Sequence, residues 1–114
     1  MNRTVDLVIA GGGNDTFAAA AEALQRGRRI LVLLRASDAR VGRRFRRRLY
    51  KAVNVNGGQV AVATNVEVAC VDGVDGVEVV VIRHARTGRL CAVNASAFLS
   101  CDGSTALGRG DPGS

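Results

Sequence analysis

The chain contains no tryptophan, one histidine, one proline, one tyrosine and three phenylalanines among its 114 residues. With His84 as the lone histidine, the sequence argues against a Ser-His-Asp hydrolase and against a metal enzyme. The three cysteines, Cys70, Cys91 and Cys101, are odd in number and form no Cys-x-x-Cys pair. Neither a disulfide framework nor a redox-active cysteine pair is therefore expected, and no residue is assigned a catalytic role.

Long apolar runs are also missing. No segment approaches the roughly 20 apolar residues that a membrane-spanning helix needs. The apolar run at residues 7–10 is too short, and too close to Asp6, to be the core of a signal peptide. We expect a cytoplasmic, reduced protein whose cysteines are small core residues. The length allows one domain with a core of its own.

Glycine, in contrast, is well represented, and three of the fourteen glycines stand together at positions 11–13. The apolar run at residues 7–10 precedes them, an alanine-rich stretch follows, and a second apolar run covers residues 30–34. A strand, a glycine turn, a helix and a second strand within about thirty residues form the layout of a dinucleotide-binding βαβ unit.

Each part of this turn has its own physical role. Gly11 would let the chain turn sharply out of the strand, and Gly13, which lacks a Cβ, would let a diphosphate approach the backbone. The amides of Asn14, Asp15 and Thr16 begin a helix whose N-terminus favours an anion. Two features depart from the usual pattern: Thr16 replaces a third glycine or alanine, and Asp15 adds negative charge. The alternative is a glycine-rich turn that binds nothing.

The end of the second strand usually indicates which ribose is bound. An acidic side chain there accepts hydrogen bonds from ribose hydroxyls, whereas an arginine accommodates a 2′-phosphate. Leu34 occupies the position of the acid, and Arg35 follows it. The next carboxylate after Leu34 is that of Asp38. The pattern is compatible with a 2′-phosphate held by Arg35, helped by Arg40 or Arg43. The alternative for Arg35 is a solvated strand end.

The formal net charge of +6 is concentrated in one segment. Residues 40–51 contain six arginines and one lysine. If Asp38 caps a helix that runs through Val53, its apolar side consists of Val41, Phe45, Leu49, Ala52 and Val53. The charged side could meet nucleic acid, an anionic membrane or an acidic protein, or could only be solvated. Because Phe45 and Tyr50 are its only aromatics, we do not expect nucleic acid to be the main partner.

The second half of the chain predicts strands. Apolar segments at residues 59–63, 66–71, 77–84, 90–93 and 95–100 are separated by turn signals such as Asp72-Gly73 and Thr87-Gly88. Three of them in antiparallel succession make a meander. We predict a single α/β domain over residues 1–103, a Rossmann-like parallel sheet with a three-stranded β-meander. Gly27 ends its first helix, and residues 104–114 form a flexible, glycine-rich tail.

This order resembles the nucleotide-binding module of the two-dinucleotide-binding flavoprotein oxidoreductases, a superfamily that includes fumarate reductase-like, amino-acid-oxidase-like and thioredoxin reductase-like proteins. The resemblance covers residues 5–103. Its most specific part is Asp-Leu-Val-Ile-Ala-Gly-Gly-Gly at residues 6–13, supported by residues 57–68, by Thr87-Gly88 and by residues 94–103. In the family the closing strand runs into an Ala-Thr-Gly type turn, and here residues 100–103 read Ser-Cys-Asp-Gly.

The resemblance implies FAD or NADP(H), with adenine near the backbone of residues 66–68. The position of the glycine turn and the closing strand favour FAD, whereas Leu34-Arg35 looks more like an NADP(H) module. We expect FAD, with NADP(H) as the alternative. The candidate cofactor-binding residues are Gly11, Gly12, Gly13, Asn14, Asp15, Thr16, Arg35, Val68, Asp102 and Gly103.

Family members normally carry a second region that supplies the flavin-facing wall and the substrate pocket. About twenty-five residues separate Arg35 from the third strand here, too few for such a region. We therefore expect the FAD-binding module of an oxidoreductase that works with a partner or substrate domain, either a larger subunit or a second copy. A non-catalytic module that binds polyanions through the arginine-rich helix is the alternative.

Overall fold

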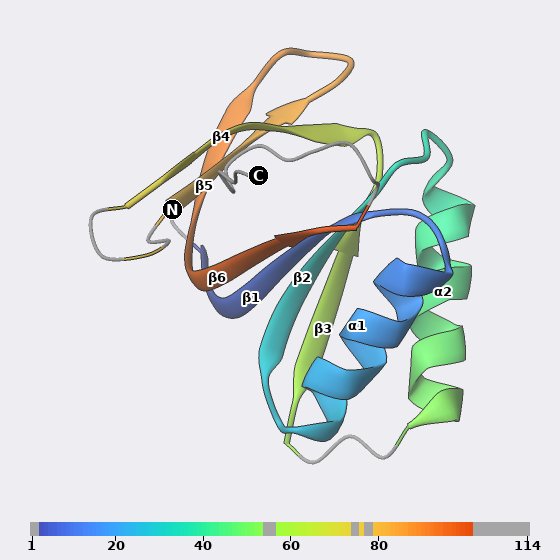
Figure 1. The fold of residues 1–114 in the computed structure, drawn as a ribbon. Coiled ribbons are helices and arrows are strands. Elements are labelled where there is room, and N and C mark those ends of the chain that lie inside the picture. The colour runs from blue at the N-terminus through green and yellow to red at the C-terminus, as the bar shows by residue number, and fades with distance from the viewer. Residues whose placement is uncertain (1–2, 54–56, 74–75, 77–78, 102–114) are drawn as a thin grey trace.

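The computed structural model describes residues 3–53, 57–73, 76 and 79–101 (Figure 1). Within them the chain forms eight elements in the order expected from the sequence. These are β1 (Arg3–Gly11), α1 (Asn14–Gln25), β2 (Arg29–Leu34), α2 (Ala39–Ala52), β3 (Gln59–Ala63), β4 (Val66–Asp72), β5 (Val79–His84) and β6 (Leu90–Ser100). The predicted tail at residues 104–114 lies outside the described residues.

The strands form one mixed sheet in the order β3-β2-β1-β6-β5-β4. Strands β3, β2, β1 and β6 are parallel neighbours, whereas β6, β5 and β4 pair antiparallel. The predicted fold class, a Rossmann-like parallel sheet with a three-stranded meander, is confirmed. Its first crossover is the α1 connection from β1 to β2 that the glycine turn predicts.

The end of the chain differs from the prediction. The expected strands at residues 90–93 and 95–100 are one continuous strand, β6, without a turn at Asn94. Asn94 pairs with Val79 of β5 on one side and with Thr4 of β1 on the other. Asparagine is depleted in strands, and this misled the prediction. Pairing on both sides overrides that preference, so β6 belongs to the meander and to the parallel sheet.

Side chains from the two faces of the sheet form two core clusters. Helices α1 and α2 cover one face (Figure 1), where Ile9, Leu24 and Leu49 are fully buried. On the other face the sheet curls until β4 contacts β2, and Leu33 packs with Val66 there. Strand β2 is therefore buried on both faces, as its uninterrupted apolar sequence predicts.

The end of α1 and the start of α2 lie where the local sequence predicts them. Gly27, at φ +77°, follows α1, and its N–H donates to the carbonyl of Leu24 over 3.1 Å. The Arg28 N–H donates to Ala23 over 3.2 Å, which completes the pair of bonds typical of a glycine-terminated helix. Asp38 caps α2 by accepting from the Arg40 N–H over 2.9 Å. No helix in the described part of the chain is both long and apolar enough to span a bilayer.

The apolar side of α2 is only partly as predicted. Phe45 and Leu49 are buried and Val53 packs beside them, but Val41 and Ala52 are exposed. Gly42 is buried in their place, because α2 lies so close to β3 that an added Cβ would come within 3.1 Å of the Thr64 side chain. The helix is thus rotated about its axis toward β3 relative to the expected orientation.

Candidate functional site

The glycine turn lies at the carboxyl edge of the sheet, between the ends of three parallel strands. The Gly11 carbonyl accepts from the Arg35 N–H over 3.0 Å, and the Ala10 carbonyl accepts from the Cys101 N–H over 2.7 Å. Strand β1 pairs with β2 on one side and with β6 on the other. In open α/β sheets ligands bind at this point, where the strand order reverses direction.

Gly11 and Thr16 fit together beneath the turn. Gly11 has φ +155°, and a Cβ built on it would overlap Thr16 Oγ1 and lie 3.1 Å from the Cys101 Cβ. Thr16 is completely buried, and its hydroxyl has no hydrogen-bond partner within the described structure. The side chain of Thr16 therefore packs against the turn and does not face a ligand.

The N-terminus of α1 is open. Gly13 occupies the N-cap position and provides no side-chain cap, and Gly12, Gly13, Asn14 and Asp15 are all exposed. A Cβ added to Gly13 would meet no atom within 4 Å. The first-turn N–H groups thus face accessible space, the arrangement that favours an anion. Asp15 adds a carboxylate to the same turn.

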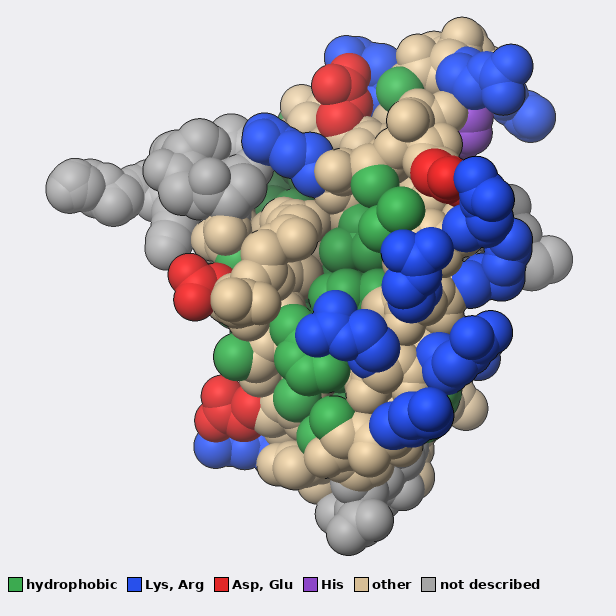
Figure 2. Space-filling model, turned by 90° about the vertical axis from the view of Figure 1, so that its right-hand side faces the viewer, with side chains coloured by type: hydrophobic (Ala, Val, Ile, Leu, Met, Phe, Trp, Pro, Cys, Tyr) green, Lys and Arg blue, Asp and Glu red, His purple; other side chains and the backbone are tan. Residues whose placement is uncertain are grey.

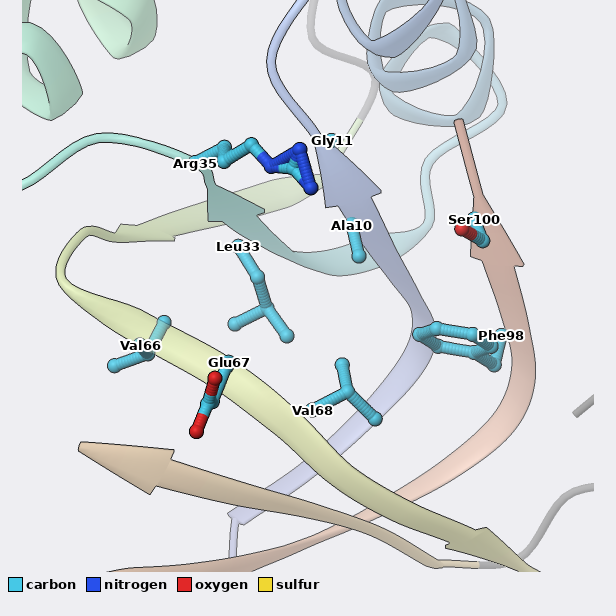
Figure 3. A pocket seen from close by; sticks show the side chains of 9 residues that line it. All are labelled: Ala10, Gly11, Leu33, Arg35, Val66, Glu67, Val68, Phe98 and Ser100. Carbon is cyan, nitrogen blue, oxygen red and sulfur yellow. The ribbon is translucent and has the colours of Figure 1, made fainter. Parts of the chain in front are cut away.

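A cleft of about 320 Å³ adjoins the turn (Figure 3). Three predicted residues, Gly11, Arg35 and Val68, line it together, although Val68 is more than thirty positions from Arg35 in the sequence. The other predicted residues with described positions do not line this cleft: Gly12, Gly13, Asn14, Asp15 and Thr16. Six further residues do so: Ala10, Leu33, Val66, Glu67, Phe98 and Ser100.

The cleft has apolar walls and a few polar groups. Leu33, Val68 and Phe98 project into it from three different strands (Figure 3). Glu67 contributes a carboxylate that also pairs with Arg83 across 3.1 Å. Apolar walls with a few polar groups are typical of small-molecule sites. The resemblance placed adenine near the backbone of residues 66–68, which include Glu67, but the sequence did not single out Phe98. The curling of the sheet brings β4 to β2.

A second, smaller cleft of about 180 Å³ lies on the helical side of the turn. Arg35, Arg44 and Arg48 line it together with Gly12, and Phe45 contributes an apolar surface. The guanidinium of Arg48 lies 4.6 Å from the centre of the Phe17 ring, which holds it beside α1. Three arginines thus line one small space.

Arg40 and Arg43, which were suggested to assist Arg35, do not lie beside it in the structure. Arg40 pairs with Asp38 across 3.1 Å, and Arg43 lines a different groove beside β3, so neither shares a cleft with Arg35. Because α2 is rotated toward β3, Arg44 and Arg48 face α1 instead. Their spacing of four residues was a usable signal, since such residues share one face of a helix.

The remaining candidates, Asp102 and Gly103, lie outside the described residues. Cys101, which follows β6, is half-buried and packs against the helix-side core. Cys70 and Cys91 are exposed, so the expectation that the cysteines are core residues is wrong for these two. In the described part of the chain, no group of three or more His, Cys, Asp or Glu side chains could hold a metal ion.

No family model matches the chain, and no curated protein matches it. Solved structures do match. Thioredoxin reductase from Streptococcus pyogenes superposes with a TM-score of 0.68 at 22% identity, over 89% of this chain and 32% of the reductase. The chain has the two-dinucleotide-binding flavoprotein fold. It shares this flavoprotein fold with bacillithiol disulfide reductase from Staphylococcus aureus, at a TM-score of 0.64 and 19% identity, over 89% of this chain and 29% of that one.

A myxobacterial FAD-dependent chondrochloren halogenase matches with a TM-score of 0.65 and 17% identity, over 89% of this chain and 38% of the halogenase. The chain therefore spans about a third of the length of these flavoprotein-fold structures. At such low identities the similarity establishes the fold.

Proposed function

We propose that this chain is the FAD-binding module of a flavoprotein oxidoreductase and holds the ADP half of the cofactor. The observation that carries the proposal is the cleft at the carboxyl edge between the glycine turn and β4, at the point where the strand order reverses. FAD would supply the hydride chemistry, and the chain would supply position and electrostatics. Neighbours with three times its length support the further proposal that a partner or substrate domain completes the enzyme.

The proposed contacts follow from the geometry of the turn. The diphosphate would lie over Gly13, where the backbone has open space, and would accept from the amides of Asn14, Asp15 and Thr16. Adenine would lie between the apolar walls, beside the backbone of Val68. Asp102 and Gly103 remain proposed neighbours of the flavin nucleotide on the basis of the resemblance alone.

Gly13 provides the sharpest test. A Gly13→Val side chain meets nothing in the free protein, and the φ of −108° suits any residue, so the fold should form, with a modest loss of stability because valine is a poor N-cap. If the diphosphate lies there, affinity for ADP and FAD falls at least tenfold, which calorimetric titration measures. The matched control is Ser37→Val in the exposed loop before α2, which lines neither cleft. Unchanged ADP affinity in Gly13→Val, or no ADP binding by the native protein, would refute the site.

The second cleft favours NADP(H) as the alternative cofactor. Arg35, Arg44 and Arg48 line this cleft at the end of β2, where a 2′-phosphate would lie, and Leu34 is buried and leaves no acid there. If this alternative is correct, 2′-phosphorylated ADP binds at least tenfold more tightly than ADP. Arg35→Glu abolishes that preference, whereas Arg86→Glu, in the turn between β5 and β6, preserves it. Equal affinity for the two nucleotides selects FAD.

A further inference from the structure

The exposed side of α2 carries a dense group of cations. Figure 2 shows Lys and Arg side chains gathered on this side of the molecule. Helix α2 contains six arginines and one lysine but no acidic residue. We propose that this side of α2 binds the phosphate backbone of a nucleic acid, independently of base sequence.

Among the described residues, direct ion pairs involve only one of the cations on α2. Outside α2, three arginines pair with carboxylates: Arg26 with Glu22, Arg29 with Asp6 and Arg83 with Glu67. On α2, Arg40 pairs with Asp38. For Arg43, Arg44, Arg47 and Lys51, the described structure contains no carboxylate within ion-pair distance. Four positive charges thus lie close together, none of them in a direct ion pair within the described structure.

Three of these cations form a column along the helix, and the fourth lies beside it. Arg43, Arg47 and Lys51 follow each other at intervals of four residues, and Arg44 lies beside them, so all four fall within an arc of about 100°. From Arg43 to Lys51 the helix rises about 12 Å, which corresponds to about three or four phosphates along one strand of duplex DNA. The number and the length of the cationic column therefore match a phosphate backbone.

The same structure argues against the other polyanions. A helix that binds a membrane surface inserts its apolar side, but Phe45 and Leu49 of α2 are buried in the core of the protein. An interface with an acidic protein depends on buried apolar anchors, and among the exposed large apolar residues α2 offers only Val41 and Tyr50, with Arg46 over the Tyr50 ring. Arginine, with its planar fork of donors, suits phosphate better than lysine does.

The sequence alone did not favour nucleic acid as the main partner of the arginine-rich helix. The scarcity of aromatics argued against stacking of single-stranded bases, but backbone binding does not require stacking. The folded structure adds that four cations on one side of α2 have no direct ion pair among the described residues.

Salt-dependent binding tests the proposal. Fluorescence anisotropy with a labelled 20-base-pair duplex of random sequence should show binding at about 50 mM salt, with log affinity falling against log salt at a slope of about −3 to −4. Arg43→Gln/Arg47→Gln removes two charges that line neither of the two clefts at the glycine turn. It should reduce the slope by about 2 and the affinity at least tenfold at about 100 mM salt.

The control variant Arg86→Gln/Arg89→Gln removes the same charge from the exposed turn between β5 and β6 and should retain the native slope. Saturating ADP should leave duplex binding unchanged, and polyglutamate of equal charge concentration should displace the duplex only weakly. The proposal is overturned if the native protein does not bind at about 50 mM salt or if both double variants lose affinity equally. It is also overturned if ADP displaces the duplex, or if polyglutamate binds as well as the duplex does.

Discussion

Gly11 and Thr16 share one small space at the carboxyl end of β1, and each residue accounts for the identity of the other. A threonine where a third glycine or alanine is usual would crowd the turn, but Gly11 has no Cβ and leaves room for Thr16 Oγ1. The position of the first glycine is therefore required by packing as well as by any ligand. The sequence predicted the turn and the misfit of Thr16, but not that the two residues compensate.

This contact predicts an interaction between two substitutions. Gly11→Ala forces its methyl group against Thr16 and Cys101 and should lower the free energy of unfolding by about 1–3 kcal/mol. In a Thr16→Ala background the same change should cost less, because one of the two obstructing groups is gone. Chemical denaturation of the two single variants and the double variant measures the coupling. Strict additivity would show that the two residues do not share this space.

Asp38 gives a pH-dependent contribution to the start of α2. Its pKa lies below the usual value of 3.8, first because its side chain accepts hydrogen bonds from the Arg40 side chain, then because it accepts from the Arg40 N–H; the charges of Arg43 and Arg44 lower it further. A pKa depressed in the folded state stabilises the protein above the unfolded pKa, and this stabilisation is lost as pH falls through the folded pKa.

We therefore expect the Tm advantage of the native protein over Asp38→Asn to shrink between about pH 5 and pH 2. The asparagine keeps an oxygen that can cap the helix but does not titrate, so it serves as the reference. Thermal unfolding followed by circular dichroism across this range checks the prediction. A constant difference in Tm would mean that the charge of Asp38 contributes nothing to the cap.

Helix α2 combines stabilising packing on one side with self-repulsion on the other. Arg43, Arg47 and Lys51 are like charges at intervals of four residues, and each such pair destabilises a helix by about 0.2–0.5 kcal/mol. Phe45 and Leu49 anchor the helix in the core in spite of this repulsion. Binding of a polyanion would relieve the repulsion.

Arg47→Glu should therefore stabilise the free protein by about 1 kcal/mol, since two repulsive pairs become two attractive ones. The gain should shrink in high salt, where exposed pairs are screened. Arg26→Glu, at the C-cap of α1, is the control with the opposite sign, because it replaces the ion pair with Glu22 by a repulsion. Denaturant titrations of both variants at low and high salt measure the effect. A loss of stability in Arg47→Glu would show that the column is compensated in some other way.

The elements themselves were predictable, and their orientations were not. Apolar runs and turn residues placed the strands, except that they divided β6 in two. The rotation of α2, however, depends on the close approach of Gly42 to Val62 in β3 and to Thr64, which follows β3. No local pattern encodes that approach. The same rotation decides that Arg44 and Arg48, and not Arg40 and Arg43, lie near Arg35. Local sequence predicts which residues share a helix side, whereas tertiary packing decides where that side points.

At the scale of the whole molecule, the cleft that adjoins the glycine turn is small for a complete dinucleotide. Its volume of about 320 Å³ is at the low end for ligand sites, and its lining residues belong to the strand ends and to β4. The glycine turn and the parallel sheet were foreseeable from short-range patterns. The part of the wall formed by Val66 and Val68 was expected only through the family resemblance, and Phe98 was not expected at all, since its place in the wall depends on how the sheet curls.

A cleft of this size predicts that FAD and ADP bind the isolated chain with affinities within about threefold of each other, because the flavin would gain few contacts in a space this small. Competition of unlabelled ADP against FAD, read from flavin fluorescence, measures the ratio. FAD binding at least tenfold tighter than ADP would contradict this expectation and would reveal a flavin site within the chain itself.

Strand β6 leaves no linker between the two halves of the structure. It pairs with β5 up to Asn94 and with β1 from Val93 onward, so one uninterrupted backbone fixes the meander against the parallel strands. The distance between β4 and the end of β2 is consequently set during folding, before any nucleotide arrives. Recognition would then proceed as entry into a preorganised slot, with little conformational entropy left to lose.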